Sequence, residues 1–378
     1  MAADFDIAIS GAGPVGLALA LLLVKRGIPA TRIALIDAKP VEQAVRDPRS
    51  IALSYGSRQI LQEVGVWPVA ADPIHQIHVS RRGHFGRTMI DRDEYELPAL
   101  GYVTRYGLLV NALAAAVKRT DVVSMRPAQL TSFAEREDHV EMHFSQGIPY
   151  AAHIMVQAEG GLFQDQGAKS LRRDYEQTAV VAEVKTSAPI PHRAFERFTD
   201  GGPLALLPLD DGYALVWCMR PDDASRLHAL TDTAFLAELG QAFGSRVGRF
   251  TGVTQRSLFP LGLNAHPATS ARTVAIGNAA QTLHPVAGQG LNLGLRDAMV
   301  LARLLSEEFS PAMLERFAIS RRTDRSLTIR LTDTMARVFS SAPDGAPSQA
   351  MLGLSLGLID VFKPAKRVLA EQMMFGRR

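Results

Sequence analysis

The sequence predicts an α/β protein in which one sheet domain with crossing helices is joined to a sheet-rich α+β domain and to C-terminal helices. Near the N-terminus, the short apolar strand Phe5–Ser10 leads directly into a glycine-rich turn and a long apolar helix over residues 17–24. A second strand, glycine-rich turn and helix occupy residues 273–297. Between these two units, runs of β-branched and aromatic residues at 178–184 and 204–218 are typical of sheet.

The N-terminal unit has the pattern of a Rossmann-like dinucleotide site. Gly11, Gly13 and Gly16 form G-x-G-x-x-G, and a second strand over residues 32–36 ends in Asp37, about 20 residues past the last glycine. In this pattern the first glycine makes the tight turn, the second lets a pyrophosphate approach, and the third packs helix on strand, while the acid accepts from a ribose hydroxyl. The glycines alone are weak evidence, but the complete set predicts a bound dinucleotide.

The second unit offers another helix N-terminus to a ligand. Residues 273–276 predict a buried strand, and a helix is expected from near Leu291. Gly288 and Gly290 flank Gln289 just before it, so bare N–H groups and the helix dipole could face a flat or anionic group. On these residues alone, an ordinary strand–turn–helix connection explains the pattern equally well.

Together with DPRSIALS at residues 47–54, the two units resemble the UbiH-type ubiquinone-biosynthesis hydroxylases, flavin monooxygenases related to para-hydroxybenzoate hydroxylase. The resemblance covers nearly the whole chain, to the MMFG ending, and its most specific stretch is LHPVAGQGLNLGLRD. It implies FAD as cofactor, NAD(P)H as electron donor and O2 as co-substrate. It further implies hydroxylation of a polyprenyl-phenol intermediate of ubiquinone biosynthesis by a flavin C4a-hydroperoxide.

The resemblance also implies site residues. Arg49 would bind the FAD diphosphate with its guanidinium fork. Pro285 would lie over the flavin ring and shape the oxygen site, and the helix N-terminus after Gly290 would stabilise negative charge on the reduced ring. The expected cofactor-binding residues are Gly11, Gly13, Gly16, Asp37, Arg49, Gly277, Asn278, Gly288, Gln289, Gly290, Leu291 and Asn292.

Four positions need comment against the family pattern. Asn278 stands where an aspartate is usual, Glu159 replaces another aspartate, and Gln281 replaces a histidine. An asparagine carbonyl can accept the same hydrogen bond without the charge, so we expect FAD binding to survive. His284 is a candidate base, although structural hydrogen bonding explains it as well. A second pyridine-nucleotide motif is missing, so the binding place of the reductant stays open.

Composition excludes several other classes of protein. The 378 residues suffice for two domains, and 47% hydrophobic with 21% charged residues argues against disorder. A net charge of +3 without basic tracts between aromatic residues argues against nucleic acid. Cys218 is the only cysteine, so no disulfide framework or thiol metal site is expected. No signal-peptide pattern precedes the first strand, which predicts a cytoplasmic protein.

The predicted domains are discontinuous. Residues 1–70, 100–165 and 270–310 are assigned to the FAD-binding domain, 71–99 and 166–269 to a substrate-binding sheet domain, and 311–378 to a C-terminal helical region. Helices are expected over residues 50–64, 100–118, 222–243 and 311–339. Arginines of the last helix, including 321 and 325, are expected to form a solvated face.

Several single residues are open between two interpretations. Arg105, at the start of the predicted helix 100–118, could reach the cofactor or be a surface charge. Trp217, Phe259 and Leu261 could line a substrate pocket, although core packing is the better explanation for each.

The C-terminal stretch 351–362 is almost wholly apolar and is followed by Lys363, Lys366 and Arg367. It is too short to span a bilayer, but it could rest on the inner face of the plasma membrane or cover an apolar tunnel. A terminal helix docked on the core is the plain alternative. The expected partners are a polyprenylated phenol, a membrane surface and a ubiquinone-biosynthesis protein assembly.

Two rival functions remain open from the sequence. One is a different flavin oxidoreductase, either a polyprenyl reductase or a hydroxylase of a soluble aromatic compound. The other is a non-catalytic subunit that presents lipid intermediates, which only Glu159 and Asn278 favour.

Overall fold

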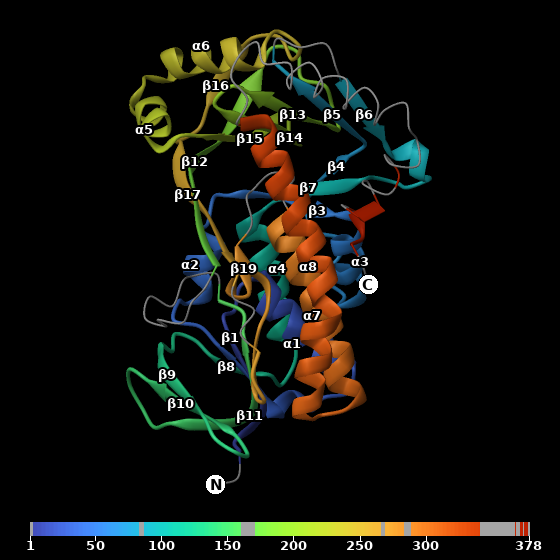
Figure 1. The fold of residues 1–378 in the computed structure, drawn as a ribbon, viewed down its shortest axis with the longest axis vertical. Coiled ribbons are helices and arrows are strands. Elements are labelled where there is room, and N and C mark those ends of the chain that lie inside the picture. The colour runs from blue at the N-terminus through green and yellow to red at the C-terminus, as the bar shows by residue number, and fades with distance from the viewer. Residues whose placement is uncertain are drawn as a thin grey trace.

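The structure is a computed structural model that describes residues 3–82, 87–159, 171–265, 269–282 and 289–340, together with 367, 371–372 and 374–376. Two sheet domains lie one above the other along the long axis (Figure 1). The sheet that contains β1 lies toward the N-terminus, and a larger sheet lies at the opposite end. The C-terminal residues that are described lie between the two domains, at one side.

The first sheet has a parallel centre. In spatial order its strands are β8 (Val123–Met125), β2 (Ile33–Ile36), β1 (Phe5–Ser10), β11 (Tyr150–Gln157), β10 (Val140–Phe144) and β9 (Leu130–Glu135), with β18 (Thr273–Ala275) also paired to β11. Neighbouring strands are parallel from β8 through β2, β1 and β11 to β18. Strand β10 runs antiparallel to both of its neighbours, β11 and β9. The carboxyl ends of the parallel strands therefore share one edge, where such sheets bind ligands.

Both faces of this sheet are covered, which explains why β1 is apolar at almost every position. One face packs on α1 (Pro14–Lys25), α4 (Tyr106–Val117) and α7 (Gln289–Glu307), with Ile7 and Ile9 in the shared core. On the other face, Phe5 and Ala8 pack against side chains of β9 and β10. The short helices are η1 (Ala30–Arg32), α2 (Val41–Val45), η2 (Arg92–Tyr95) and η3 (Gly277–Ala279).

The larger sheet has nine strands among the described residues. They are β5 (Gln76–Arg81), β6 (Arg87–Asp91), β12 (Leu171–Thr186), β13 (Arg193–Thr199), β14 (Gly202–Leu209), β15 (Gly212–Met219), β16 (Phe250–Val253), β17 (Ser257–Ala265) and β19 (Gln281–Thr282). The helices α5 (Pro221–Ala229) and α6 (Asp232–Phe243) cover its outer face (Figure 1). Trp217 packs there against Phe235, so Trp217 is a core residue. The other, inner face of this sheet points toward the first domain.

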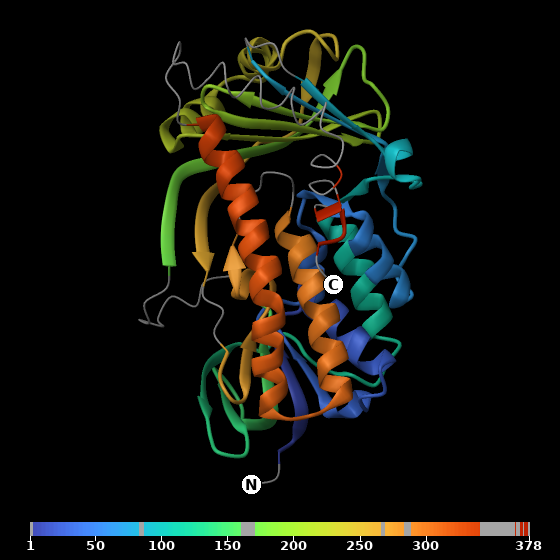
Figure 2. The ribbon, with the colours of Figure 1, turned by 45° about the vertical axis from the view of Figure 1, so that its right-hand side comes forward.

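A long helix, α8 (Pro311–Ser340), runs beside α7 and reaches the larger sheet at its C-terminal end (Figure 2). The predicted helix over 311–339 is thus confirmed. No helix among the described residues is both long and apolar enough to cross a membrane.

Three predicted helices are wrong in part. Residues 50–64 contain β3 (Ser50–Ser54) before α3 (Tyr55–Glu63), and residues 100–118 contain β7 (Gly101–Arg105) before α4. Strands β3 and β7 pair with each other, and β4 (Asp72–Ile74) pairs with β7, so this small sheet depends on partners far away in the chain. The predicted helix 222–243 is divided, because Thr231 ends the first part and caps α6 through the N–H of Ala234.

The predicted solvated arginine face of α8 is also wrong. The side chains of Arg321 and Arg325 are 2% and 7% exposed. Arg321 bonds Asp297 of α7 at 2.7 Å and also Asp324, while Arg325 bonds Asp297 at 2.9 Å. These arginines are buried because α8 packs its charged side against Asp297 of α7, a partner that the periodicity of α8 could not reveal.

Candidate cofactor and substrate site

The N-terminal glycine turn is shaped by close backbone packing. Gly11 has φ +107°, its N–H donates to the carbonyl of Ile36 at 2.8 Å, and a Cβ there would lie 2.6 Å from the carbonyl carbon of Ala158. A Cβ on Gly16 would lie 1.9 Å from the carbonyl oxygen of Gly11. A Cβ on Gly13, by contrast, would have only the Tyr106 hydroxyl within 4 Å among the described atoms. The fold itself requires Gly11 and Gly16, whereas Gly13 leaves space beside the turn.

Asp37 ties this turn to the end of β2. Its Oδ2 accepts from the N–H of Ala12 at 2.8 Å, and its Oδ1 accepts from the N–H of Lys39 at 2.8 Å. The side chain is still 20% exposed, so one side of the carboxylate remains accessible at the ligand edge of the sheet. This placement suits acceptance from a ribose hydroxyl.

Glu159, the departure from the family pattern, lies directly under the glycine turn. It follows β11 and accepts a hydrogen bond from the hydroxyl of Ser10. Burial raises the pKa of its carboxyl and the charge of Asp37 adds to this, while the Ser10 hydrogen bond opposes it. The Glu159 carboxyl therefore lies close to Asp37, the acid that follows β2.

Arg49 is held at the junction of the two domains. Its Nε lies 2.9 Å from Oδ1 of Asp47 and its Nη2 lies 2.6 Å from Oδ2. Burial opposes ionisation of Asp47, but the hydrogen bonds and charge of Arg49 outweigh it and lower the Asp47 pKa. The guanidinium also stacks over Tyr106 at 4.9 Å and over Phe259 of β17 at 5.4 Å. A side chain that is 41% exposed and so fixed is ready to receive an anion.

The second glycine unit converges on the same region. Gly277 has φ +58°, and its N–H donates to Asp297 of α7 at 3.3 Å. Asn278 is exposed, and its Oδ1 lies 3.7 Å from the position that a Cβ on Gly290 would take. The end of β18 and the start of α7, which begins at Gln289, thus lie together. His284, Pro285 and Gly288 lie outside the described residues.

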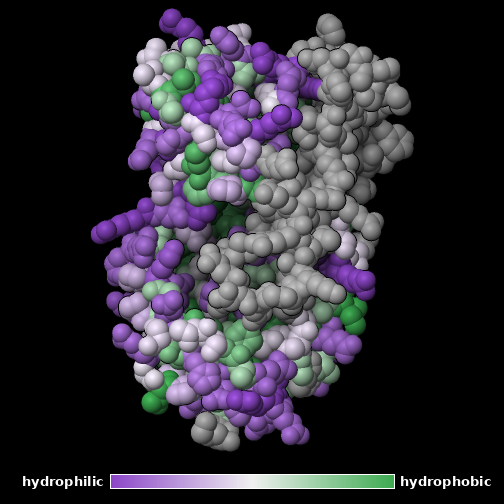
Figure 3. Space-filling view, turned by 60° about the vertical axis from the view of Figure 1, so that its left-hand side comes forward, coloured by the Kyte–Doolittle hydropathy of each residue, from purple (hydrophilic) through white to green (hydrophobic). Residues whose placement is uncertain are grey.

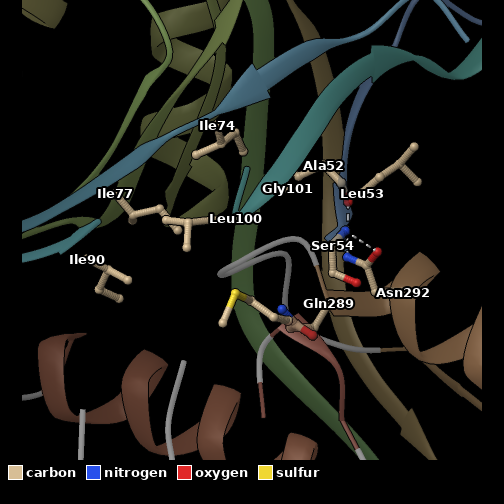
Figure 4. A pocket seen from close by; sticks show the side chains of 11 residues that line it. Ala52, Leu53, Ser54, Ile74, Ile77, Ile90, Leu100, Gly101, Gln289 and Asn292 are labelled. Atoms are coloured by element: carbon tan, nitrogen blue, oxygen red, sulfur yellow. Dashed lines mark hydrogen bonds between the residues drawn. The ribbon is translucent and has the colours of Figure 1, made fainter. Parts of the chain in front are cut away.

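Asn292 fastens α7 to β3 and α3. Its Oδ1 accepts from the N–H of Ser54 at 2.8 Å, and its Nδ2 donates to the carbonyl of Ala52 at 3.0 Å (Figure 4). The Oδ1 also accepts from the hydroxyl of Ser57 at 2.7 Å. Its side chain is 2% exposed and occupied by protein groups. A cofactor contact of Asn292 would therefore come from its backbone. Leu291 packs partly into the core beside it.

A pocket lies between the start of α7 and the two sheets above it (Figure 4). Its cavity volume is about 70 Å³, and the pocket is partly open to solvent. One wall is apolar, and the opposite end is polar with Ser54, Gln289 and Asn292. The apolar residues are Ile74, Ile77, Ile90, Leu100 and Met374. The described part of the surface is mostly hydrophilic at both ends of the molecule, with hydrophobic residues in the hollow between the domains (Figure 3).

Met374 is a lining residue that sequence reasoning missed. It is 4% exposed and packs with Ile90 and Leu100. The next residue, Phe375, contacts the ring of Tyr55 edge-on with centroids 5.9 Å apart. The MMFG ending was a family signature, but nothing local indicated that it folds back to the pocket.

Arg105 makes protein contacts instead of pointing to the cofactor. It bonds Glu183 of β12 at 3.0 Å and Asp210, in the turn before β15, at 2.7 Å. It therefore joins the small sheet to the large one. Leu261 is half-buried on β17, and Gln281 is buried.

These features define an FAD-binding flavoprotein with a second domain over its pocket. Residues 4–325 match the FAD binding domain family, and the chain belongs to this family of FAD-dependent monooxygenases. It is 32% identical over 387 residues to the ubiquinone hydroxylase UbiL of Rhodospirillum rubrum, covering 98% of this chain and 89% of the relative. It is 31% identical over 345 residues to the 3-demethoxyubiquinol 3-hydroxylase of Escherichia coli, covering 84% of this chain and 86% of the relative.

Solved structures share the fold at low identity. The p-nitrophenol 4-monooxygenase of Pseudomonas putida superposes with a TM-score of 0.80 at 16% identity, covering 100% of both chains. HpxO of Klebsiella pneumoniae, complexed with FAD and uric acid, gives a TM-score of 0.75 at 14% identity, covering 99% of this chain and 98% of that one. The predicted fold class and the FAD cofactor are confirmed.

Proposed function

We propose that this protein is an FAD-dependent aromatic-ring hydroxylase that acts on a polyprenyl-phenol intermediate of ubiquinone biosynthesis, with NAD(P)H as electron donor and O2 as co-substrate. The observation that carries the proposal is the pocket, in which an apolar wall faces the polar start of α7. The ubiquinone hydroxylases among the relatives support the same substrate class.

The residues present fit FAD. The cradle at Gly11 and Gly16 has no room for side chains, and Gly13 leaves space for a diphosphate. Asp37 is placed to accept from the adenosine ribose, and Arg49 is fixed where an anion can bind it. When bound, FAD supplies the redox chemistry, receiving a hydride and delivering activated oxygen.

The chain's own contribution to the reaction is orientation, charge and exclusion of water. The N-terminus of α7, through its helix dipole, would stabilise negative charge on the reduced ring. The side chains of Ile77, Ile90 and Leu100 would keep water from the reacting ring carbon and hold the aromatic substrate. We propose that Pro285, which lies outside the described residues, shapes the site where O2 reacts.

The long prenyl tail of such a substrate implies a lipid source. We propose peripheral contact with the inner face of the plasma membrane, and contact with other proteins of the pathway. Support comes from the sequence alone: residues 351–362 are apolar except for Ser355 and Asp360, and they precede Lys363, Lys366 and Arg367. Residues 351–366 lie outside the described part of the chain.

Purified protein with FAD should be supplied with NADH or NADPH, 18O2 and a series of prenylphenols, and the products identified by mass spectrometry. Our proposal predicts a product that carries one 18O atom on the ring. Addition of two hydrogens to a prenyl double bond would identify a reductase, and preference for tail-free phenols would identify a hydroxylase of soluble compounds. Absence of FAD binding would favour the lipid-presenting subunit.

A further inference from the structure

Arg126 is a buried cation with unfilled hydrogen-bonding capacity. It follows β8 at the edge of the parallel sheet, and its side chain is 4% exposed. Its Nε donates to the carbonyl of Lys39 at 3.1 Å. Its Nη1 and Nη2 are buried and have no hydrogen-bond partner among the described residues.

The nearest carboxylate does not fill these positions. Nη2 of Arg126 lies 3.9 Å from Oδ2 of Asp37, beyond hydrogen-bond distance, and that oxygen already accepts from Ala12. Burying a guanidinium with two unsatisfied groups is costly to the folded protein. A side chain retained at such a cost is expected to gain its missing partners from a ligand.

The position of Arg126 identifies the ligand. The carboxyl ends of β1, β2 and β8 meet at this edge, because β2 pairs in parallel with both of the others. This edge carries the glycine turn and Asp37, where the adenosine half of a dinucleotide binds. Arg296 also has unpartnered nitrogens, but it belongs to the buried cluster between α7 and α8, away from this edge.

We propose that Arg126 is a cofactor-binding residue that donates to the adenosine half of FAD, with one ribose hydroxyl bridging its Nη2 and the Asp37 carboxylate. A ribose hydroxyl can donate to the carboxylate and accept from the guanidinium at once. This inference rests on FAD as the cofactor. It adds a second side chain to the ribose site that the glycine motif defines.

The test compares Arg126→Met with Arg126→Lys and with the control Arg136→Met, which removes an exposed arginine paired to Glu141 on the outer hairpin β9–β10. Apoprotein is titrated with FAD and with FMN, which lacks adenosine, by flavin fluorescence, and each apoprotein is melted. Arg126→Met should weaken FAD binding about 10- to 100-fold, since a charge-assisted hydrogen bond is lost. FMN binding should not change, and Arg126→Lys should recover part of the affinity.

The apoprotein melt separates binding from a structural role. Removal of a buried cation whose Nη groups have no hydrogen-bond partner among the described residues should leave the Tm of the apoprotein unchanged or raise it, whereas removal of a structural arginine should lower it. Unchanged FAD affinity in Arg126→Met would overturn the proposal. Equal weakening of FAD and FMN, or a lower apoprotein Tm that accounts for the loss, would do the same. A parent protein that binds neither flavin would contradict the proposed function instead.

Discussion

Gly13 and Gly16 are three residues apart, yet their surroundings differ. Gly13 has φ −75° and ψ −176°, which any residue can adopt, and a Cβ there would meet only the Tyr106 hydroxyl, at 3.3 Å, among the described atoms. Gly16 lies against the Gly11 carbonyl, where a methyl group would be only 1.9 Å from oxygen. One position can therefore be tested for cofactor binding and the other for folding.

Gly13→Ala should leave stability nearly unchanged and abolish FAD binding, because its methyl group would block the diphosphate. Gly16→Ala should lower the free energy of unfolding of the apoprotein by about 2–3 kcal/mol, since the turn must move. Urea denaturation of the apoproteins and FAD titration measure both effects. Full FAD affinity in Gly13→Ala would show that the diphosphate does not pass this residue.

Glu196 adds a titratable group to the inner face of the larger sheet. In the register of the sheet, Glu196 of β13 lies opposite Val79 of β5 on one side and Ala205 of β14 on the other. Ala194, two residues earlier on the same face, packs in one cluster with Ile74 of the pocket wall. Burial raises the pKa of the Glu196 carboxyl to about 7.

This raised pKa predicts how stability depends on pH. The unfolded chain releases the Glu196 proton near pH 4.5, whereas the folded protein keeps it to about pH 7. Protonated Glu196 therefore contributes to the free energy of unfolding on the order of 2 kcal/mol. This contribution is fully present below pH 4.5 and is lost as the pH rises to 7. Glu196→Gln should remove this decline, as measured by urea denaturation between pH 4.5 and 8.

Glu238→Gln is the matched control, because the hydrogen bond from Arg226 lowers the Glu238 pKa. Ionisation of Glu238 therefore changes stability only below pH 4.5, outside the measured range. An identical pH dependence in the parent and Glu196→Gln would mean that Glu196 ionises normally in the folded protein.

At the scale of elements, α7 and α8 are joined by a buried charge cluster. It contains the cations Arg296, Arg321 and Arg325 and the carboxylates Asp297 and Asp324, which are both 0% exposed. Asp297 also accepts from the N–H of Gly277, so the cluster supports the turn that leads to the pocket. The helix pair therefore positions the site as well as covering the sheet.

Asp324→Asn should destabilise the protein by about 3–5 kcal/mol, because it leaves three buried cations with one carboxylate. Asp324 now accepts from Arg296 at 3.1 Å, from Arg321, and from Gln372 at 2.9 Å. The control is Glu238→Gln at the exposed Arg226 pair, where only a small loss is expected. Equal midpoints in urea for Asp324→Asn and the parent would contradict the assigned role.

Features that depend on neighbours in the chain were predictable, and features that depend on distant partners were not. The strand, glycine turn and helix at residues 5–24 follow from local periodicity and steric need. Ser50–Ser54 was taken as helix, because only its pairing with Gly101–Arg105 makes it a strand. The burial of Arg321 was missed for the same reason, because its partner Asp297 comes from α7 by tertiary packing. The pocket position of Met374 and the free donors of Arg126 likewise required the folded chain.

At the scale of the whole molecule, the C-terminal end links the pocket to α8. Gln372 bonds Asp324, Met374 lines the pocket, and Phe375 contacts Tyr55. The apolar stretch 351–362 lies between α8 and these contacts in the chain. The structure describes the chain on both sides of this stretch in sequence, so its removal can test the proposed lipid handling.

Truncation after Ser348 tests this role when compared with Met374→Ala in the full chain. Both glycine units remain, so FAD binding should persist. Met374→Ala should reduce kcat/KM equally for a long-tailed prenylphenol and a short-chain analogue, because it alters the ring pocket. Truncation should add a further loss, up to about 100-fold, for the long-tailed substrate on lipid vesicles alone, since three basic residues contribute about 1 kcal/mol each. If the truncated protein melts below the assay temperature, the removed segment is part of the core. If truncation and Met374→Ala cause equal losses of kcat/KM for both substrates, the segment has no role in lipid handling.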